Sequence, residues 1–480
     1  MTLGRPHYQP FFLQQMYSIL LFILSLLSFL SLTFACSNRP SSFGTSPYDV
    51  HPEAMTAVAG VRPGLITRSW LVTPASLNHR EGKSNRFDAS CAYRFFIDIP
   101  VRRSLDPYHV RASRKFSSSA RASSSTSTSA IPHISLHIAA AASGKRQKFK
   151  PDLNTYVFDP DSQDAIGVQS GRNHQEIQRS RPSSGEDAFF VAKVGSGSGS
   201  QSNATAFGIL DGVGGWASHG IDPADFSHGL SSHMAKIALK WKDGDLKPKE
   251  LLRIGYRTTI ADPSISAGGT TACVAVASRE GRMQIANLGD SGFIQLRAGA
   301  VHHYSNPQTH AFNTPYQLSI TPPHILAQAE IFGGIPLNDA PDKADLQDHM
   351  LRHGDVLILA TDGVWDNLNS QEVLNIVSNE MRARGAWQKD EEQGFVVTEK
   401  IVSLTRPSQR KTLQGRIAAA IVAEAKTASH NEKRDGPFAK ETRKFYPNDP
   451  YHGGKVDDIS VLVVIPVDSS KIDGLLKAKL

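Results

Sequence analysis

The chain has 480 residues, and 52 Lys and Arg against 45 Asp and Glu give it a net charge of +7. The excess lies in residues 1–150, with 18 basic and 6 acidic side chains, whereas residues 151–480 hold 34 basic and 39 acidic ones. Nucleic-acid-binding domains are normally basic, so the acidic part argues against nucleic acid as a partner. Three cysteines without C-x-x-C spacing exclude a disulfide framework and favour a reducing compartment.

A hydrophobic segment at residues 17–35 is the first feature along the chain. It carries no charge, and a helix of this length spans roughly the ~30 Å hydrocarbon thickness of a bilayer. Three interpretations stay open. The segment is a membrane anchor, or a secretory signal with Arg5 as its basic flank and Ala35 near the cleavage point, or an upstream artefact ahead of a true start at Met55.

The following stretches are rich in Arg and Ser, and residues 55–78 and 107–135 contain no acid. This composition is typical of mitochondrial transit peptides, although a disordered linker can share it. The sequence Arg114-Lys115-Phe116-Ser117 resembles a matrix-protease cleavage site. We therefore expect a mitochondrial matrix location, with membrane anchoring through residues 17–35 as the alternative. We also expect residues 1–150 to be a disordered targeting region and residues 151–480 to be the folded domain.

The C-terminal part alternates short β-branched runs with Gly and Asp turns. Helices are expected where apolar residues recur at spacings of three and four, over 223–241, 370–383 and 413–428. Residues 384–412 are polar and are interpreted as an exposed insertion. The pattern predicts an α+β fold, a central antiparallel β-sandwich flanked by helices. The expected strands run over 207–210, 271–277, 283–287, 292–297, 356–360 and 459–465.

Acidic residues stand at the ends of several expected strands. A single Asp-Gly is usually a turn. Several carboxylates at the ends of core strands, however, would repel one another unless cations held them together. Mg²⁺ and Mn²⁺ prefer oxygen ligands and need no His or Cys. The pattern predicts a dinuclear metal site built from Glu186-Asp187, Asp211-Gly212, Gly289-Asp290, Asp362-Gly363 with Asp366, and Asp457-Asp458.

In this order the motifs resemble those of the 2C-type (PPM) metal-dependent serine/threonine protein phosphatases. The resemblance covers about residues 160–468. It is greatest to the mitochondrial branch of the family, through Asp211 to Trp216, Asn287 to Phe293, Phe312 to Leu318 and Gly453 to Ile459.

The resemblance implies a role for each acidic position. Asp211 is expected to bridge two Mn²⁺ or Mg²⁺ ions, and the Gly212 carbonyl, Asp362 and Asp457 are expected to complete their protein ligands.

Four further acids match positions around the ion pair. Glu186 and Asp187 match positions that hold metal-bound waters, and Asp290 and Asp366 match positions that serve a third, weaker ion.

Two positions depart from the family pattern. Many members have a histidine, proposed as the general acid, directly after Asp-Gly, where this chain has Val213. Many also have a phosphate-binding arginine four residues before the Glu, where this chain has Pro182. Arg179 or Arg181 is the expected substitute.

The resemblance implies dephosphorylation of phosphoserine and phosphothreonine in proteins, by direct attack of a water that two metal ions activate. One alternative is a pseudophosphatase-like regulator that binds phosphoproteins. The other is a hydrolase of small phosphoesters. The expected partners are phosphoprotein substrates and no nucleic acid, with a monomeric catalytic domain.

Overall fold

A computed structural model of the chain describes residues 133–161, 164–198, 204–332, 337–392, 394–407 and 411–471. The hydrophobic segment 17–35, the transit-like stretches up to residue 132 and the cleavage expected near Phe116 lie outside these ranges. Among the residues that are described, no helix is long and apolar enough to cross a membrane.

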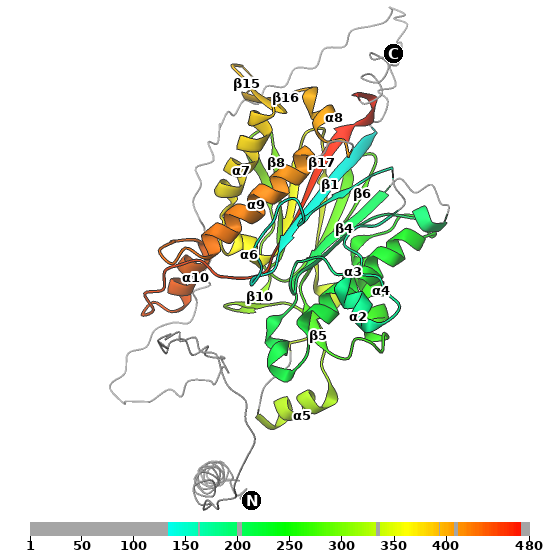
Figure 1. Ribbon diagram of the computed structural model, residues 1–480, viewed down its shortest axis with the longest axis vertical. Helices are drawn as coiled ribbons and strands as arrows, with labels where there is room; N and C mark the ends of the chain where they lie inside the picture. Colours follow the sequence, from blue (N-terminus) through cyan, green and yellow to red (C-terminus); the bar gives the residue numbers. More distant parts are fainter. Residues whose placement is uncertain are drawn as a thin grey trace, which may run out of the picture. The chain divides into compact units, whose positions relative to one another are not determined.

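Two antiparallel sheets form the centre of the fold (Figure 1). The six-stranded sheet has the order β2-β1-β17-β14-β8-β9, and the five-stranded sheet has the order β13-β7-β6-β4-β3. Their strands are β1 Ile134–Ser143, β2 Thr155–Phe158, β3 Ala188–Lys193, β4 Ala204–Leu210, β6 Ala272–Ser278, β7 Arg282–Leu288, β8 Gly292–Arg297, β9 Ala300–Tyr304, β13 Asp345–Met350, β14 Val356–Ala360 and β17 Ile459–Asp468.

Smaller elements connect these strands. Three strand pairs are β5 Gly268–Thr270 with β12 Leu318–Ile320, β10 Thr309–Ala311 with β11 Thr314–Pro315, and β15 Trp387–Asp390 with β16 Gly394–Val397. The helices are α2 His174–Arg179, α3 Pro223–Lys240, α4 Pro248–Ile260, α5 Pro323–Phe332, α6 Asp362–Trp365, α7 Ser370–Ala383, α8 Lys400–Leu404, α9 Leu413–Ser429 and α10 Pro437–Phe445, with 3₁₀ turns η1 Ser196–Ser198, η2 Gly214–His219 and η3 Pro341–Lys343.

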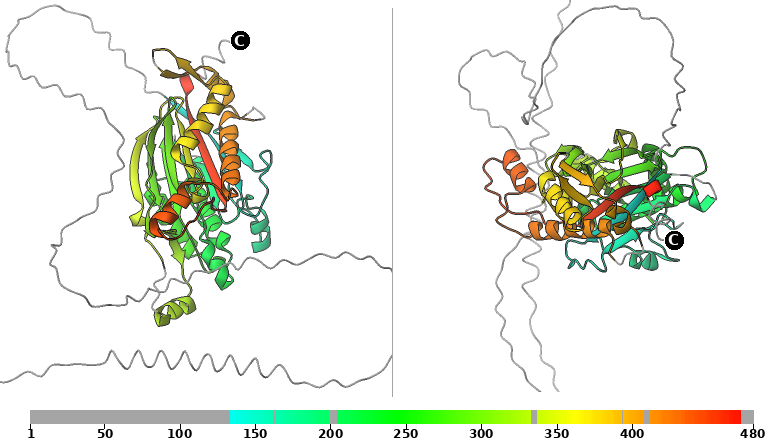
Figure 2. Two further views of the ribbon diagram at one scale, coloured as in Figure 1. Left: turned by 90° about the vertical axis from the view of Figure 1, so that its left-hand side faces the viewer. Right: turned by 90° about the horizontal axis from the view of Figure 1, so that it is seen from above.

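Three apolar layers hold the domain together. The layer between the sheets contains Ile138, Phe207 and Leu462, all fully buried. Helices α7 and α9 pack on the outer face of the six-stranded sheet, and α3 and α4 pack on the outer face of the other sheet (Figure 2). This arrangement confirms the predicted α+β sandwich flanked by helices.

Local signals in the sequence fix where the main helices begin. Asp222 accepts a hydrogen bond from the Ala224 N–H ahead of α3, and Pro223 occupies the first helical turn, where its missing N–H costs nothing. Asn369 and Glu372 form a capping box at α7. The expected helices over 223–241, 370–383 and 413–428 are confirmed, and so are the six expected strands.

Strand β1 is an inner strand of the six-stranded sheet, between the edge strand β2 and β17. The fold therefore begins upstream of the boundary expected at residue 150. The run from Ala139 to Ala142 has low β propensity, so it gives little strand signal in the sequence. Because all four alanines are buried between neighbouring layers, packing and not propensity makes this segment a strand.

The prediction of an exposed insertion at residues 384–412 is wrong. This segment forms the β15–β16 hairpin and α8, and it buries Trp387, Ile401 and Val402 in the layer beneath α7 and α9. The Trp387 indole also donates a hydrogen bond to the Gly354 carbonyl at 3.2 Å. The buried apolar residues are few, and the polar composition of the segment hides them.

Stability at acidic pH should depend on His137 in β1, which is 4% exposed. Burial lowers the pKa of His137 from 6.5 to about 4. The unfolded imidazole binds a proton below about 6.5, whereas the folded one stays neutral, so stability present above pH 6.5 is lost as the pH falls towards 4. The loss should reach about 3 kcal/mol.

His137→Leu should therefore flatten the dependence of Tm on pH between 6.5 and 4, measured by thermal unfolding in a set of buffers. His302→Gln, at an exposed position of β9, is the matched control and should follow the wild type. Equal slopes for wild type and His137→Leu would contradict the prediction.

Candidate metal centre

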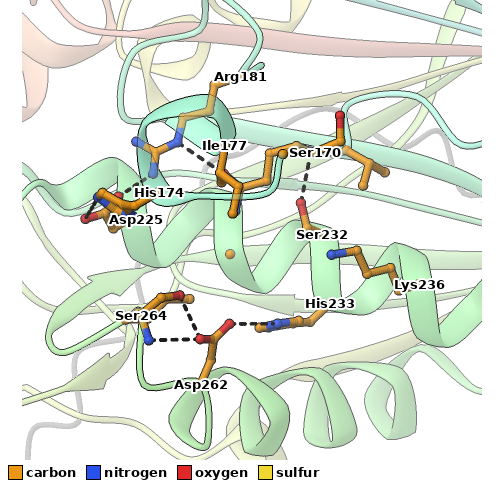
Figure 3. Close-up of a pocket in the computed structure, with 15 residues that line it drawn as sticks. Ser170, His174, Ile177, Arg181, Asp225, Ser232, His233, Lys236, Asp262 and Ser264 are labelled. Atoms are coloured by element: carbon orange, nitrogen blue, oxygen red, sulfur yellow. Dashed lines mark hydrogen bonds and ion pairs between the residues drawn. The ribbon is translucent and has the colours of Figure 1, made fainter. Parts of the chain in front are cut away.

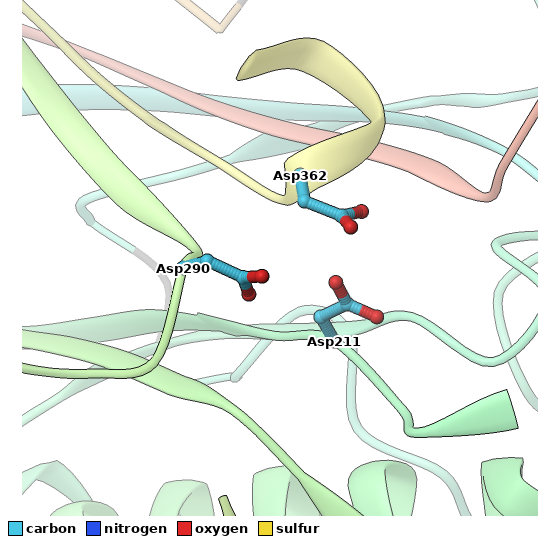
Figure 4. Close-up of side chains that lie close together, drawn as sticks. All are labelled: Asp211, Asp290 and Asp362. Carbon is cyan, nitrogen blue, oxygen red and sulfur yellow. The ribbon is translucent and has the colours of Figure 1, made fainter. Parts of the chain in front are cut away.

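Strand ends from both sheets bring three aspartates together. Asp211 follows β4 and Asp290 lies in the turn after β7, both in the five-stranded sheet, whereas Asp362 follows β14 in the six-stranded sheet. Each offers one carboxylate oxygen, and these oxygens lie within 4.8 Å of one another (Figure 4). The two sheets therefore form one acidic centre at the same end of the sandwich.

The backbone around Asp211 is held by a neighbouring strand. Its N–H donates to the Thr271 hydroxyl at 3.2 Å, and its carbonyl accepts from the Thr270 hydroxyl at 2.8 Å. Gly212 then passes close to Glu186, because a Cβ at this position would meet the Glu186 carbonyl oxygen at 2.4 Å. Only glycine lets the Asp211 turn and the Glu186 segment approach this closely.

A second set of acids precedes the strands that border this centre. Glu186 and Asp187 lead into β3, and Asp457 and Asp458 lead into β17. Asp187 accepts a hydrogen bond from the Thr361 hydroxyl at 2.8 Å, directly before Asp362. Asp458 accepts from the Glu186 N–H at 2.9 Å, so the two strand entries are tied to each other.

Two lysines lie among these acids. The Lys455 ammonium contacts Asp362 and lies 2.8 Å from Asp366 and 3.3 Å from Asp457. Lys145, in the loop after β1, lies 3.4 Å from Glu186. The sequence interpretation missed both lysines. Lys455 lies inside the motif from Gly453 to Ile459. Lys145 lies in residues 1–150, for which the sequence predicts a targeting region.

Lys145 also fixes Asp458 through its backbone. Its N–H donates to Asp458 Oδ1 at 2.5 Å, although the two residues are 313 positions apart in the chain. The loop after β1 is therefore part of the wall of the centre. No local pattern in the sequence reveals this contact, because it exists only when β1 pairs with β17.

Burial and mutual repulsion perturb the carboxylates strongly. Burial, followed by the charge of Asp362, raises the pKa of Asp211 well above its ordinary value. The same two causes raise the pKa of Asp290 to about 8. Burial alone would also raise the pKa of Asp362, but the Lys455 ammonium lowers it below the ordinary value. The centre thus holds more negative charge than its own lysines neutralise.

The donor atoms fit a hard divalent cation. Oδ1 of Asp187 and Oδ1 of Asp290 are buried, and neither finds a hydrogen-bond partner among the residues that the structure describes. Buried polar atoms are normally satisfied, and an unsatisfied one calls for an ion or a water. Carboxylate oxygens without His or Cys suit Mg²⁺ or Mn²⁺. The residues therefore meet the chemical requirement for binding these metals.

Of the two expected substitutes for the missing arginine, Arg179 lies in the last turn of α2 and Arg181 is bound elsewhere. The Arg181 guanidinium is paired with Asp225 and with Asp222, the latter at 3.0 Å. It lines a pocket of about 320 Å³ beside α2 and α3, with His174 and Lys236 (Figure 3). The acids of the metal centre are not among the residues that line this pocket. Arg181 therefore serves the packing of α2 against α3 in this structure.

No family model matches the chain. Comparison with known proteins finds relatives that this chain matches over most of their length. The protein phosphatase PTC7 homolog of Xenopus laevis is 33% identical over 282 residues, which cover 58% of this chain and 81% of that protein. The PTC7 homolog of Homo sapiens is 32% identical and is covered to 79%.

A yeast relative extends further along the chain. Protein phosphatase 2C homolog 7, mitochondrial, of Saccharomyces cerevisiae is 30% identical over 371 residues, which cover 76% of this chain and 96% of that protein. Among solved structures, the photosystem II phosphatase PBCP covers 63% of this chain with 25% identity and a TM-score of 0.43. The sequence relatives confirm the expected resemblance, and the chain belongs to the PTC7 family of 2C-type protein phosphatases.

Proposed function

We propose that this protein phosphatase removes phosphate from phosphoserine and phosphothreonine in proteins, by direct attack of water in a metal-dependent reaction. The observation that carries the proposal is the partly buried group formed by Asp211, Asp290 and Asp362, whose oxygens lie within 4.8 Å of one another. So much unneutralised charge destabilises the domain unless cations bind there. Membership of a phosphatase family supplies the reaction class.

Four residues are proposed as protein ligands of two Mn²⁺ or Mg²⁺ ions: Asp211, the Gly212 carbonyl, Asp362 and Asp457. When bound, such a pair supplies Lewis acidity that lowers the pKa of water and neutralises charge on the phosphoryl group. The role of the chain is to hold these oxygens at fixed strand ends, so that little reorganisation is needed during the reaction.

The surrounding acids are proposed to orient the water shell. Glu186 is placed by the hydrogen bond from its N–H to Asp458, and Asp187 by the hydrogen bond from Thr361. Asp290 and Asp366 are the proposed ligands of a third, weaker ion if one binds. In the structure Asp366 faces Lys455 at 2.8 Å, so this position already has a cation beside it.

Position 213 cannot supply a proton to the leaving alkoxide. Val213 directly follows the Asp211-Gly212 turn, and its N–H donates to the Gly269 carbonyl at 3.0 Å. We propose that the reaction proceeds without a side-chain general acid at this position. Cations held by the acids of the centre would then supply the positive charge next to the leaving oxygen.

We also propose a mitochondrial location after removal of the N-terminal region. The yeast relative carries "mitochondrial" in its name, and the acid-free Arg-rich stretches suit import. Because β1 begins at Ile134 and reaches the centre through Lys145, cleavage has to leave this strand intact.

Loss of the bridging ligand should abolish catalysis without loss of the fold. Asp211→Asn should lower Mn²⁺-dependent turnover of a phosphopeptide by at least about 100-fold, because this carboxylate would hold both ions. In chelator the same variant should have a higher Tm than wild type, since it removes a buried charge that Asp362 repels. Turnover and thermal unfolding are measured on one preparation.

Asp362→Asn is the matched comparison. It should abolish turnover equally, but it should not raise Tm in chelator, because Asp362 is paired with Lys455. Near-normal turnover in either variant would refute the ligand assignment.

Val213→His tests the missing general acid. The substitution should speed hydrolysis of an alkyl phosphate, which has a poor leaving group, by about tenfold or more, since general acid catalysis is worth about 10²–10⁴. It should change hydrolysis of an activated aryl phosphate much less. Val213→Gln, of similar length without a titrating group, is the control. Equal acceleration of both substrates would argue against protonation of the leaving group as the lost step.

Import should remove the N-terminal region near Phe116. A negative-inside potential is worth about 2.3 kcal/mol per charge per 100 mV, so an acid-free Arg-rich segment is drawn inwards. N-terminal sequencing of the endogenous protein should give a start near Phe116 and before Ile134. Arg114→Ala should impair this cleavage, whereas Arg111→Ala should not. Recovery of a peptide from residues 1–50 in the mature protein would favour the membrane anchor.

A further inference from the structure

Lys455 lies inside the carboxylate group and not at its rim. Its ammonium contacts Asp362, and Asp366 and Asp457 lie at 2.8 Å and 3.3 Å. Only 16% of the side chain is exposed. A lysine ammonium is a compact point charge with three donors. Here three carboxylates converge on the ammonium. A small metal cation bound at this place would need the same arrangement.

The backbone of Lys455 is fixed on both sides by one buried amide. The Lys455 N–H donates to Asn367 Oδ1 at 3.0 Å, and Asn367 Nδ2 donates to the Lys455 carbonyl at 2.8 Å. Asn367 is fully buried and also binds the Gly363 carbonyl at 2.9 Å. The amide therefore couples the position of Lys455 to helix α6, which begins at Asp362 and is capped by Asp366.

Two further contacts restrict the side chain. A Cβ at Gly454 would meet the Ala428 carbonyl oxygen at 2.2 Å, so the chain ahead of Lys455 is pressed against the end of α9. The ammonium lies 5.6 Å from the centre of the Phe438 ring, a cation–π distance. The structure thus directs Lys455 inwards, whereas an exposed lysine would be free to turn to solvent.

Asp362 is shared by two groups. One set contains Asp211 and Asp290, which each have a carboxylate oxygen within 4.8 Å of one from Asp362. The other contains Lys455 and Asp366. Two cations cannot occupy the second set at once, because the ammonium and a divalent ion would repel each other at such short range.

We propose that Lys455 is a permanent cation of this centre, and that its ammonium takes the place of a third divalent ion beside Asp366. The proposal rests on the proposed metal-dependent function. It limits the number of divalent ions bound per chain to two. It makes Lys455 a positioning residue that holds Asp362 and Asp457 through charge, while the ions bind on the Asp211 side.

The number of bound ions tests the proposal directly. Equilibrium dialysis against excess Mn²⁺, followed by elemental analysis, should find one ion more per chain in Lys455→Gln than in wild type. Lys455→Arg keeps the charge and should match wild type. Lys444→Gln, an exposed lysine on α10, is the control for loss of a lysine. The additional ion should disappear in the double variant Lys455→Gln with Asp366→Asn, since Asp366 would be its ligand.

Thermal unfolding gives a second readout that does not depend on activity. In chelator Lys455→Gln should unfold at a lower temperature than wild type, because three carboxylates lose their counter-charge. Added Mn²⁺ should raise its Tm by more than it raises that of wild type. A Lys455→Gln chain that folds only with Mn²⁺ would also support the proposal.

An unchanged ion count in Lys455→Gln would overturn the proposal, and so would a wild type that binds three ions. If Lys455→Gln folds under no condition, the ion count of the single variant Asp366→Asn tests the proposal. This variant should leave the wild-type ion count unchanged, and a loss of one ion would refute the role of Lys455. A wild-type chain that binds no Mn²⁺ would refute the proposed function as well. If the wild type is active and Lys455→Gln binds the same number of ions, the proposal for Lys455 is refuted and the proposed function is not.

Discussion

Repulsion among buried carboxylates is the constraint on which the rest of this structure depends. Two rigid apolar sheets end at the same place, and their strand ends carry Asp211, Asp290 and Asp362. The aspartates cannot move apart without disrupting the packing of β4, β7 and β14, whose residues fill the core. The charge must therefore be relieved by cations. The same rigid packing holds the carboxylate oxygens in a fixed arrangement.

The two lysines of the centre come from opposite ends of the folded chain. Lys145 follows the first strand and Lys455 precedes the last one, and β1 and β17 pair along their length. They partly neutralise Glu186, Asp362 and neighbouring acids. A buried ion pair is costly unless its geometry is good. Here the backbone contacts of Lys145 and Lys455 supply that geometry.

The departures from the family pattern are consistent with this dependence on cations. Val213 supplies no proton, and Arg181 is engaged by Asp222 and Asp225 at the start of α3. Position 213 therefore offers no side-chain acid, and Arg181 does not reach the acids of the centre. Electrostatic stabilisation of this kind works best where donors and charges are fixed before the reaction begins.

The sequence alone determined the family, the sandwich of strands and helices, and the acids at the strand ends. Their signals are local: β-branched runs, helical spacing of apolar residues, and Asp-Gly turns repeated along the chain. Only the tertiary structure decided that Ala139 to Ala142 form an inner strand, that Trp387 is buried, and that Lys145 reaches Asp458. The strand and the Lys145 contact depend on the pairing of β1 with β17, and Lys145 and Asp458 are 313 positions apart. Local propensity carries no information about such pairings, because packing energy is gained only when both partners are in place.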